Sequence, residues 1–366
     1  MQTEVSREME LLQEDGRITQ EGYARRPVWR YRRGAVRAPW WRIKEWDYYA
    51  VIDQERGAGV TITFSDLGYA GLMALCFVDV KHGLFRQVDT LKPLTRGKLG
   101  LAEEADTPHV LEYADKTLWL RLERAGDQRR LSFSDGGSGA AGAAAHGSTS
   151  SAGTGVKAGS GARLEGEIVL RQPAEQERMA IATSWAKKRT AFYYNQKINC
   201  MPAEGWMRAE GDEYRFAPET SFGVLDWGRG RWTYRNRWYW ASASGLVDGV
   251  PFGFNLGYGF TDRSPASENM LFYGGKSLRA HKLEDVSFEF DAEDYLKPWK
   301  VHSSDGRLEM LFEPTVNRAG RFNMLLIESD QKQVFGYYSG RAVLDDGRTL
   351  EFSGLAGFAE DVFNRW

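Results

Sequence analysis

The sequence predicts an all-β protein made of two successive antiparallel, barrel-like halves. Strand-like segments flank Asp-Gly pairs at Asp305-Gly306 and Asp346-Gly347, and Asp-Gly favours the positive φ angles of tight hairpin turns. No segment after residue 200 repeats apolar residues with the 3.6-residue period of a helix. Consecutive hairpins without helices favour an up-and-down meander that closes, or nearly closes, on itself. A chain of 366 residues is long enough for two such halves.

The charge and the apolar runs exclude several classes of partner. The chain has 48 Lys and Arg against 50 Asp and Glu, so no overall field favours nucleic acid or an anionic membrane. No run approaches the roughly 18 apolar residues of a membrane span, and the acidic N-terminus lacks the apolar core of a signal peptide. Only two cysteines, Cys76 and Cys200, are present, which argues against a disulfide framework. We therefore expect a soluble cytoplasmic protein.

The N-terminal region carries the one segment that favours a helix, "EVSREMELLQ" at residues 4–13. The stretch from Tyr23 to Trp46 then places seven arginines and a lysine among aromatic residues. That composition is typical of proteins that bind single-stranded nucleic acid. Because acidic residues follow at once and the total charge is balanced, we interpret the stretch as a strand pair with a solvated arginine face.

Residues 135–162 differ from the rest of the chain, because they contain no aromatic residue and almost no branched apolar residue. Such a segment buries too little apolar surface to order itself. Strand-like sequence precedes it and resumes at Arg163, so we predict a disordered insert in a hairpin loop, and an expansion without function explains it equally well. We expect an N-terminal half over residues 1–200, which contains this insert, and a C-terminal half over residues 201–366.

The C-terminal half holds an unusual strand, "FGFNLGYGF", at residues 252–260. Side chains alternate between the two faces of a strand, so one face carries large apolar groups and the other carries glycines and Asn255. The preceding segment places Trp238 and Trp240 together on one face. Two interpretations stay open. The indoles pack over the glycines as ordinary large-to-small packing, or the glycine face borders a cavity with Asn255 as its polar anchor.

Three carboxylates lie in or near these strand-like segments, at Asp226, Asp262 and Glu268. A carboxyl group in apolar surroundings has a raised pKa, because burial disfavours its charged form, and it can then donate a proton near neutral pH. We favour Glu268 and Asp226 as catalytic acids over Asp262, whose position after the strand suits a turn. Each of them has a simpler explanation too, and Asp226 could form a local ion pair with Arg229.

The histidines and glycines indicate neither a metal site nor a nucleotide cofactor. No paired-histidine or CxxC spacing occurs, and no glycine-rich loop lies between a strand and a helix. His281, in "AHKLEDVSFEF", is close enough to the carboxylates in hairpin order to be a candidate acid or orienting residue. A lone histidine is more often structural. We expect no cofactor and no metal.

Long stretches of the sequence resemble a bacterial family, the domain of unknown function 2804 family. They include "FGVLDWGRGRWTYRNRWYW", "KPWKVHSSDGRLEMLFEP" and "SDQKQVFGYYSGRAVLDDG", and the resemblance covers nearly the whole chain except the insert. More distantly, the two-half layout is similar to lipocalin-like proteins related to carotenoid 1,2-hydratase (hydroxyneurosporene synthase). Members of that group protonate or reorganise apolar polyene or terpenoid-like molecules between two barrel-like halves. Because a fold does not imply a function, no catalytic residue is carried over.

Three functions remain open at this stage. The first is a hydratase- or isomerase-type enzyme in which Glu268 or Asp226 protonates a hydrophobic, unsaturated small molecule, while aromatic rings stabilise the cation that develops. The second is a lipid- or terpenoid-binding protein without catalysis, and the third is carbohydrate binding or hydrolysis. A closed cavity with a buried acid favours the first, a closed cavity without one the second, and an open groove with two facing carboxylates the third. The predicted ligand-binding residues are Trp238, Trp240, Asn255, Tyr258 and Asn269.

Overall fold

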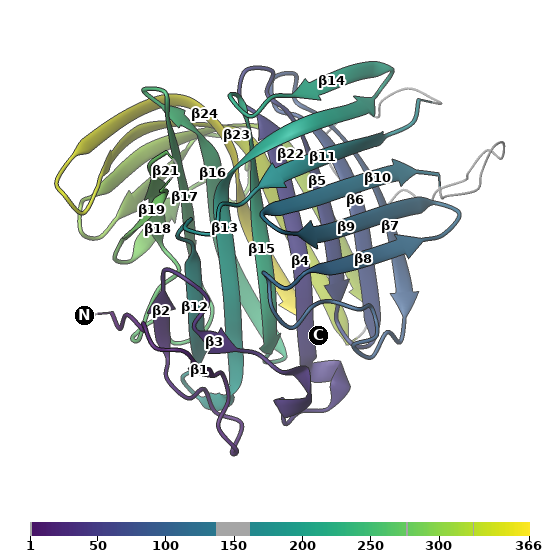
Figure 1. The fold of residues 1–366 in the computed structure, drawn as a ribbon, viewed down its shortest axis with the longest axis vertical. Coiled ribbons are helices and arrows are strands. Elements are labelled where there is room, and N and C mark those ends of the chain that lie inside the picture. The colour runs from purple at the N-terminus through teal and green to yellow at the C-terminus, as the bar shows by residue number, and fades with distance from the viewer. Residues whose placement is uncertain (1, 137–161, 276, 325) are drawn as a thin grey trace.

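The computed structural model describes residues 2–136, 162–275, 277–324 and 326–366. In this part of the chain, two large curved antiparallel sheets of 13 and 9 strands form the two barrel-like halves (Figure 1). The all-β fold class is therefore confirmed. The helical structure of the described residues consists of two short 3-10 helices, η1 (Arg33–Ala35) and η2 (Trp40–Arg42). None of the helices in these residues is long and apolar enough for a membrane crossing.

The first sheet has the strand order β7-β6-β5-β4-β15-β13-β11-β10-β9-β8, with β12, β14 and β2 attached at its margins. A separate two-stranded sheet pairs β1 (Met9–Glu10) with β3 (Trp29–Arg30). The strands of the first sheet are β2 (Gly22–Ala24), β4 (Ile43–Asp53), β5 (Ala58–Asp66), β6 (Ala70–Asp79), β7 (Leu84–Pro93), β8 (His109–Ala114), β9 (Leu118–Ala125), β10 (Gln128–Asp135), β11 (Glu165–Arg171), β12 (Met179–Trp185), β13 (Lys188–Ala209), β14 (Asp212–Phe216) and β15 (Ser221–Arg231).

The second sheet has the order β19-β18-β17-β16-β24-β23-β22-β21-β20. Most of its neighbours are also neighbours in the chain, as expected for a meander. The exception is β16, which pairs with β24 and so joins the beginning of this sheet to its last strand. Its strands are β16 (Arg235–Val247), β17 (Val250–Tyr258), β18 (Met270–Tyr273), β19 (Arg279–Lys282), β20 (Val286–Glu289), β21 (Trp299–Ser303), β22 (Leu308–Met324), β23 (Ile327–Val343) and β24 (Thr349–Arg365).

The predicted Asp-Gly turns are confirmed. Gly306 joins β21 to β22 and Gly347 joins β23 to β24, with φ angles of 70° and 83°. The aspartate before each glycine accepts a hydrogen bond from the backbone nitrogen of the residue after it, at 3.2 Å for Asp305 and 3.0 Å for Asp346. These turns follow from local chemistry, because the aspartate stabilises the turn and glycine has no Cβ to oppose a positive φ angle.

The prediction of a helix at residues 4–13 is wrong. This segment is extended and contains the short strand β1. The backbone nitrogens of Val5, Met9 and Leu11 donate to the carbonyl oxygens of Tyr23, Val28 and Arg30 at distances of 2.8 to 3.0 Å. Hydrogen bonds to a neighbouring segment, together with the burial of Val5 and Leu11, outweigh the modest helix propensity of the sequence.

Residues 137–161, most of the predicted insert, lie outside the described residues. The strands on either side of them, β10 and β11, pair with each other, and Ser134 is the cross-strand neighbour of Glu165. The predicted boundary between the halves at residues 200 and 201 stays a prediction. Near that point, β13 runs without interruption from Lys188 to Ala209, and the chain passes from the first sheet to the second between Arg231 and Arg235.

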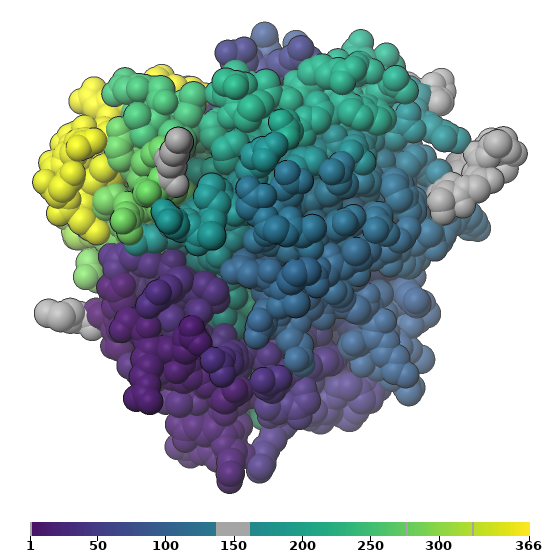
Figure 2. Space-filling model, in the orientation of Figure 1, coloured from purple at the N-terminus to yellow at the C-terminus, as the bar shows by residue number. Residues whose placement is uncertain are grey.

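The two sheets pack against each other through β4, β15 and β13 on one side and β16, β17 and β24 on the other. Each half has its own apolar core, and two further apolar clusters combine residues of both sheets. Arg318 of β22, for example, donates to Thr61 of β5 at 2.9 Å. The first residues of the chain also bridge the halves, since the backbone nitrogen of Thr3 donates to the carbonyl oxygen of Pro265 at 2.7 Å. In Figure 2 these purple N-terminal residues lie against green residues of the second sheet. This interface between the sheets is where the candidate site lies.

Candidate functional site

A row of polar side chains crosses the first sheet at this interface. Asp226 on β15 is the cross-strand neighbour of Tyr48 on β4 and of Lys197 on β13, and such neighbours point to the same face. Its carboxylate lies 2.7 Å from the Lys197 ammonium and accepts a hydrogen bond from Asn195 at 2.6 Å. The side chains of Lys197 and Asp226 are only 3% and 9% exposed. A buried ion pair of this kind is tolerated because each charge compensates the other.

A second row on the other sheet faces the first. Glu360 on β24 is the cross-strand neighbour of Gln333 on β23 and of Trp240 on β16, and Trp240 is the neighbour of Gly257 on β17. The rows touch at two points. The Lys197 ammonium lies 3.7 Å from the centre of a Trp240 ring, and Gln333 donates to the Tyr48 hydroxyl at 3.0 Å. Charged groups of both sheets therefore converge in the centre of the interface.

Glu268 covers the bare glycine of this second row. A Cβ added to Gly257 would lie 1.7 Å from Oε1 of Glu268, so the missing side chain leaves room for the carboxyl group. Glu268 is 4% exposed and accepts a hydrogen bond from the Tyr193 hydroxyl at 3.1 Å. Burial raises the pKa of this carboxyl group and the charge of Asp226 adds to the effect, while Lys197 opposes it.

Glu360 is a second acid in this cluster, and the sequence analysis did not select it. Its Oε2 accepts a hydrogen bond from Trp238 Nε1 at 3.3 Å and its Oε1 accepts one from Gln333 Nε2 at 2.5 Å. Burial raises its pKa to about 7, against the opposing effects of the Trp238 hydrogen bond and of the nearby charges of Arg318 and Lys197. The sequence did contain a signal for it. Phe358, Glu360 and Val362 are every second residue of β24 and so share one strand face, on which Phe358 and Val362 are buried.

Aromatic rings adjoin both acids. Trp232 is buried, and six rings lie 5.3 to 6.0 Å from it, centre to centre. All but Trp232 and Tyr193 are partly exposed, so the group extends from the acids to the surface. One of its members, Trp366, is the last residue of the chain, whose end is marked C in Figure 1. We call it the aromatic cluster, and it consists of Trp232 with Trp46, Trp185, Tyr193, Trp238, Phe260 and Trp366.

Asn255 and Asn269 hold the acid-bearing segment in place. Asn255 accepts a hydrogen bond from Trp240 Nε1 at 2.7 Å and donates to the carbonyl oxygen of Glu268 at 2.8 Å. Asn269 accepts from the backbone nitrogen of Gly257 at 2.8 Å and donates to the carbonyl oxygen of Glu284 at 2.9 Å. Both asparagines are fully buried. Their hydrogen bonds fix the position of Glu268 against β17.

Three of the residues singled out from the sequence lie apart from this cluster. His281 contacts Asp345 through its Nδ1, which accepts a hydrogen bond from the Asp345 backbone nitrogen at 3.2 Å. Tyr258 points to the other face of β17, where its hydroxyl accepts a hydrogen bond from the backbone nitrogen of Phe288 at 3.2 Å. Asp262 pairs with Arg189 at 2.6 Å and accepts from the backbone of Ser264, which is the turn role suggested for it. The cluster brings together Asp226, Glu268, Trp240 and Asn255, with Trp238 at its margin.

The interface also contains unsatisfied acceptors. The buried oxygens Asn195 Oδ1 and Gln333 Oε1 have no hydrogen-bond donor among the described residues. Since a buried polar atom without a partner is costly, each is suited to a water molecule or a ligand hydroxyl. The described residues contain no group of three His, Cys, Asp or Glu arranged to hold a metal ion. Two carboxyl groups whose pKa values are raised, both acted on by the Lys197–Asp226 ion pair, are candidates for proton transfer.

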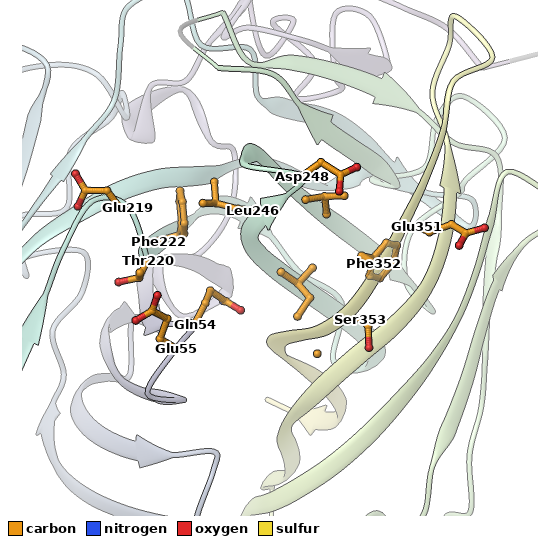
Figure 3. A pocket seen from close by; sticks show the side chains of 13 residues that line it. Gln54, Glu55, Glu219, Thr220, Phe222, Leu246, Asp248, Glu351, Phe352 and Ser353 are labelled. Atoms are coloured by element: carbon orange, nitrogen blue, oxygen red, sulfur yellow. The ribbon is translucent and has the colours of Figure 1, made fainter.

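An open cleft of about 420 Å³ lies at the opposite end of the interface, where β4 ends and β16 ends. Figure 3 shows Gln54 and Leu246 on one side of it and Phe352 on the other. Gln54 links the two sheets beside the cleft through three hydrogen bonds to backbone groups, two with Ala356 and one with Ser244. Its lining includes four carboxylates, which are Glu55, Glu219, Asp248 and Glu351.

Comparison with solved structures shows the fold. The chain is similar to kievitone hydratase from Nectria haematococca, with a TM-score of 0.51 at 9% identity, covering 87% of this chain and 88% of that one. It is similar also to a protein of Nitrosomonas europaea described provisionally as AttH, with a TM-score of 0.51 at 12% identity, covering 87% and 92%. At these identities the likeness concerns the fold alone. No curated protein shows significant sequence similarity to the chain.

The sequence itself matches one family over residues 2–366, nearly its full length. The match includes both sheets, the two acids and the aromatic cluster, and it confirms the resemblance expected from the sequence. This protein therefore belongs to the family described as Domain of unknown function (DUF2804).

Proposed function

We propose that the protein binds a hydrophobic, unsaturated small molecule at the aromatic cluster and transfers a proton to or from it through Glu268. The observation that carries the proposal is the position of Glu268. It is a buried carboxyl group with a raised pKa, bonded to Tyr193, whose ring belongs to the aromatic cluster. A carboxyl group with a raised pKa keeps its proton to a higher pH than an ordinary glutamate, so it can act as an acid or a base.

The aromatic cluster supports an apolar ligand in two ways. Its rings offer an apolar surface and π faces that attract a developing positive charge. Its outer members, among them Trp185, Phe260 and Trp366, are partly exposed, so they can separate to admit a ligand without unfolding a sheet. The name of one structural relative, a hydratase, describes chemistry of this class, although that likeness concerns the fold alone.

A binding protein without catalysis would use the same aromatic cluster. Carbohydrate binding has less support. The open cleft has several carboxylates, as that function requires, but its two aromatic residues, Phe222 and Phe352, are buried at 3% and 8% exposure. They therefore offer no free ring face on which a sugar could stack.

A direct test uses all-trans-retinol, an apolar conjugated polyene, in D₂O. We expect the wild type to bind retinol and to incorporate deuterium into it, measured by native and product mass spectrometry. Trp238→Leu should weaken binding about tenfold, the size of a good aromatic contact. Trp206→Leu is the matched control, because Trp206 lies on β13 outside the aromatic cluster, and it should bind like the wild type.

Glu268→Gln separates the two main candidates. It should bind retinol like the wild type and incorporate deuterium about 10²–10⁴-fold more slowly, because a positioned acid contributes that much. Retinol binding without deuterium incorporation in the wild type favours the binding protein. Absence of binding contradicts the proposal.

A further inference from the structure

Glu268 has a counterpart on the other side of Trp240. On the second sheet, Glu360, Trp240 and Gly257 are consecutive cross-strand neighbours, and the carboxyl group of Glu268 occupies the space over Gly257. Neighbouring strands lie about 4.8 Å apart, so the backbones that carry these two positions are about 10 Å apart. The two acids thus stand on the same sheet face with one indole between them.

Each of the two acids also contacts the aromatic cluster through one hydrogen bond. The Tyr193 hydroxyl donates to Glu268, and Trp238 Nε1 donates to Glu360. The rings of Tyr193 and Trp238 both contact Trp232, at 5.7 and 5.6 Å. Each acid is therefore linked to Trp232 through one hydrogen-bonded ring of the aromatic cluster.

Charged groups of several strands surround this pair. Lys197 of β13, Asp226 of β15 and Arg318 of β22 act on Glu360, and Glu360 acts in turn on the Tyr48 hydroxyl of β4. Lys197 and Asp226 also act on Glu268, together with Lys282 of β19 and the Tyr193 hydroxyl. Lys197 and Asp226 carry opposite charges and act on both acids. Their ion pair therefore adds no net charge to the surroundings of either acid.

We propose that Glu360 is the second catalytic group of this site, and that Glu360 and Glu268 hold a positively charged, apolar intermediate between them. The inference rests on the function proposed above and adds the division of roles. Glu360 gives its proton to one carbon of a C=C bond, whose π electrons form the new C–H bond and leave a cation. Glu268 takes a proton from a neighbouring carbon, and the electrons of the broken C–H bond form the shifted C=C bond.

This step balances without any other reactant. The product is an isomer, one proton has moved from Glu360 to Glu268, and exchange with solvent returns both groups to their starting states. Glu360 is suited to be the donor at neutral pH, because its pKa of about 7 keeps about half of it protonated there. Its partly exposed side chain gives solvent protons access to it.

The test measures binding of a cationic mimic, so it does not depend on knowing the substrate. The mimic is N,N-dimethyldecylamine, kept below its micellar concentration, and decanol is its neutral counterpart. Isothermal titration calorimetry gives the ratio of amine affinity to decanol affinity. In the wild type, this ratio should rise about tenfold from about pH 5.5 to about pH 8.5, as Glu360 becomes a carboxylate beside the bound cation.

Three variants show which acid causes the rise in the affinity ratio with pH. Glu360→Gln should abolish it, whereas Glu268→Gln should lower the ratio at high pH and keep the rise. Glu351→Gln is the matched control on the same strand, exposed and outside the cluster, and should behave like the wild type. If Glu360→Gln does not fold, Glu360→Asp should show a smaller rise, since it keeps a titrating group with a shorter reach.

The outcomes separate the two proposals. Decanol binding with a pH-independent ratio in the wild type overturns the role of Glu360 and leaves the apolar site intact. An unchanged rise in Glu360→Gln overturns that role too. If neither decanol nor the amine binds, the proposed function fails together with this inference.

Discussion

At the scale of single residues, the candidate site depends on one glycine and the carboxyl group that covers it. The alternation in "FGFNLGYGF" predicted a bare face and left open whether indoles or a ligand approach it. Trp240 is indeed the cross-strand neighbour of Gly257, but the atom closest to the missing Cβ belongs to Glu268. The sequence indicated that the face of the strand at Gly257 has room for another group. It could not identify which group fills that room, because Glu268 lies in a loop whose path depends on tertiary contacts.

Gly257→Ala tests this contact. The added Cβ displaces a buried carboxyl group and breaks its hydrogen bond to Tyr193, so we expect a loss of about 1–3 kcal/mol in the free energy of unfolding. Gly320→Ala is the control, because a Cβ there meets no atom within 4 Å. Urea denaturation measures both variants. Equal stability of Gly257→Ala and the wild type would mean that the carboxyl group does not lie over Gly257.

Glu268→Gln tests the raised pKa through stability. Because the folded-state pKa is above the unfolded value of about 4.3, the native state binds more protons. The stability from Glu268 is therefore fully present below that unfolded value and is lost as pH rises through the folded-state pKa. The glutamine variant, which cannot ionise, should gain stability relative to the wild type over this range. Urea titrations at several pH values measure it, and a constant difference between the two proteins would contradict the account.

At the scale of elements, local signals predicted turns better than they predicted the ends of the chain. The Asp-Gly hairpins formed as expected, since the aspartate and the glycine carry the turn within four residues. The N-terminal segment failed as a helix, because its backbone pairs with residues 23–30. Lys197 and Glu360 were overlooked for a related reason. Glu360 shares a strand face with the buried Phe358 and Val362, but that pattern does not identify its partners. Only the packing of the two sheets brings Lys197 and Glu360 together.

Shortening the insert tests the hairpin that contains it. Replacing residues 137–161 with a short Gly-Ser turn should change the free energy of unfolding by no more than about 2 kcal/mol, because closure entropy depends on the logarithm of loop length. The flanking strands β10 and β11 pair over seven residue pairs without these residues. Thermal melting of the shortened chain is the measurement. A large loss of folded protein would show that the replaced residues contribute to packing.

At the scale of the whole molecule, the interface between the sheets defines the candidate site. Neither sheet alone contains it, since Lys197 and Asp226 come from the first sheet, and Trp240, Glu360 and the Glu268 segment belong to the second. The relative position of the sheets therefore determines the distances between the charged groups. No pattern within the sequence reports that position, which is why two of the acids were predicted but their arrangement was not.

Gln54 tests the connection between the sheets. Its amide makes three hydrogen bonds from the turn after β4 to backbone groups of β16 and β24. Gln54→Ala should cost about 1–3 kcal/mol of unfolding free energy, because backbone groups of the second sheet lose their partners. Glu55→Ala, at the exposed neighbouring position, should leave it nearly unchanged. Equal melting temperatures for both variants would show that Gln54 does not connect the sheets.

The central claim is that Glu268, at the interface between the sheets, is a buried carboxyl group with a raised pKa. Infrared difference spectroscopy across a pH titration tests it most directly, because the protonated carboxyl group of a buried glutamate has its own C=O stretching band. The account predicts that the wild type keeps this band above the ordinary pKa of glutamate, about 4.3, and that the band is weaker in Glu268→Gln, where Glu360 still contributes to it. Wild-type and Glu268→Gln spectra that overlay throughout the titration would contradict the claim.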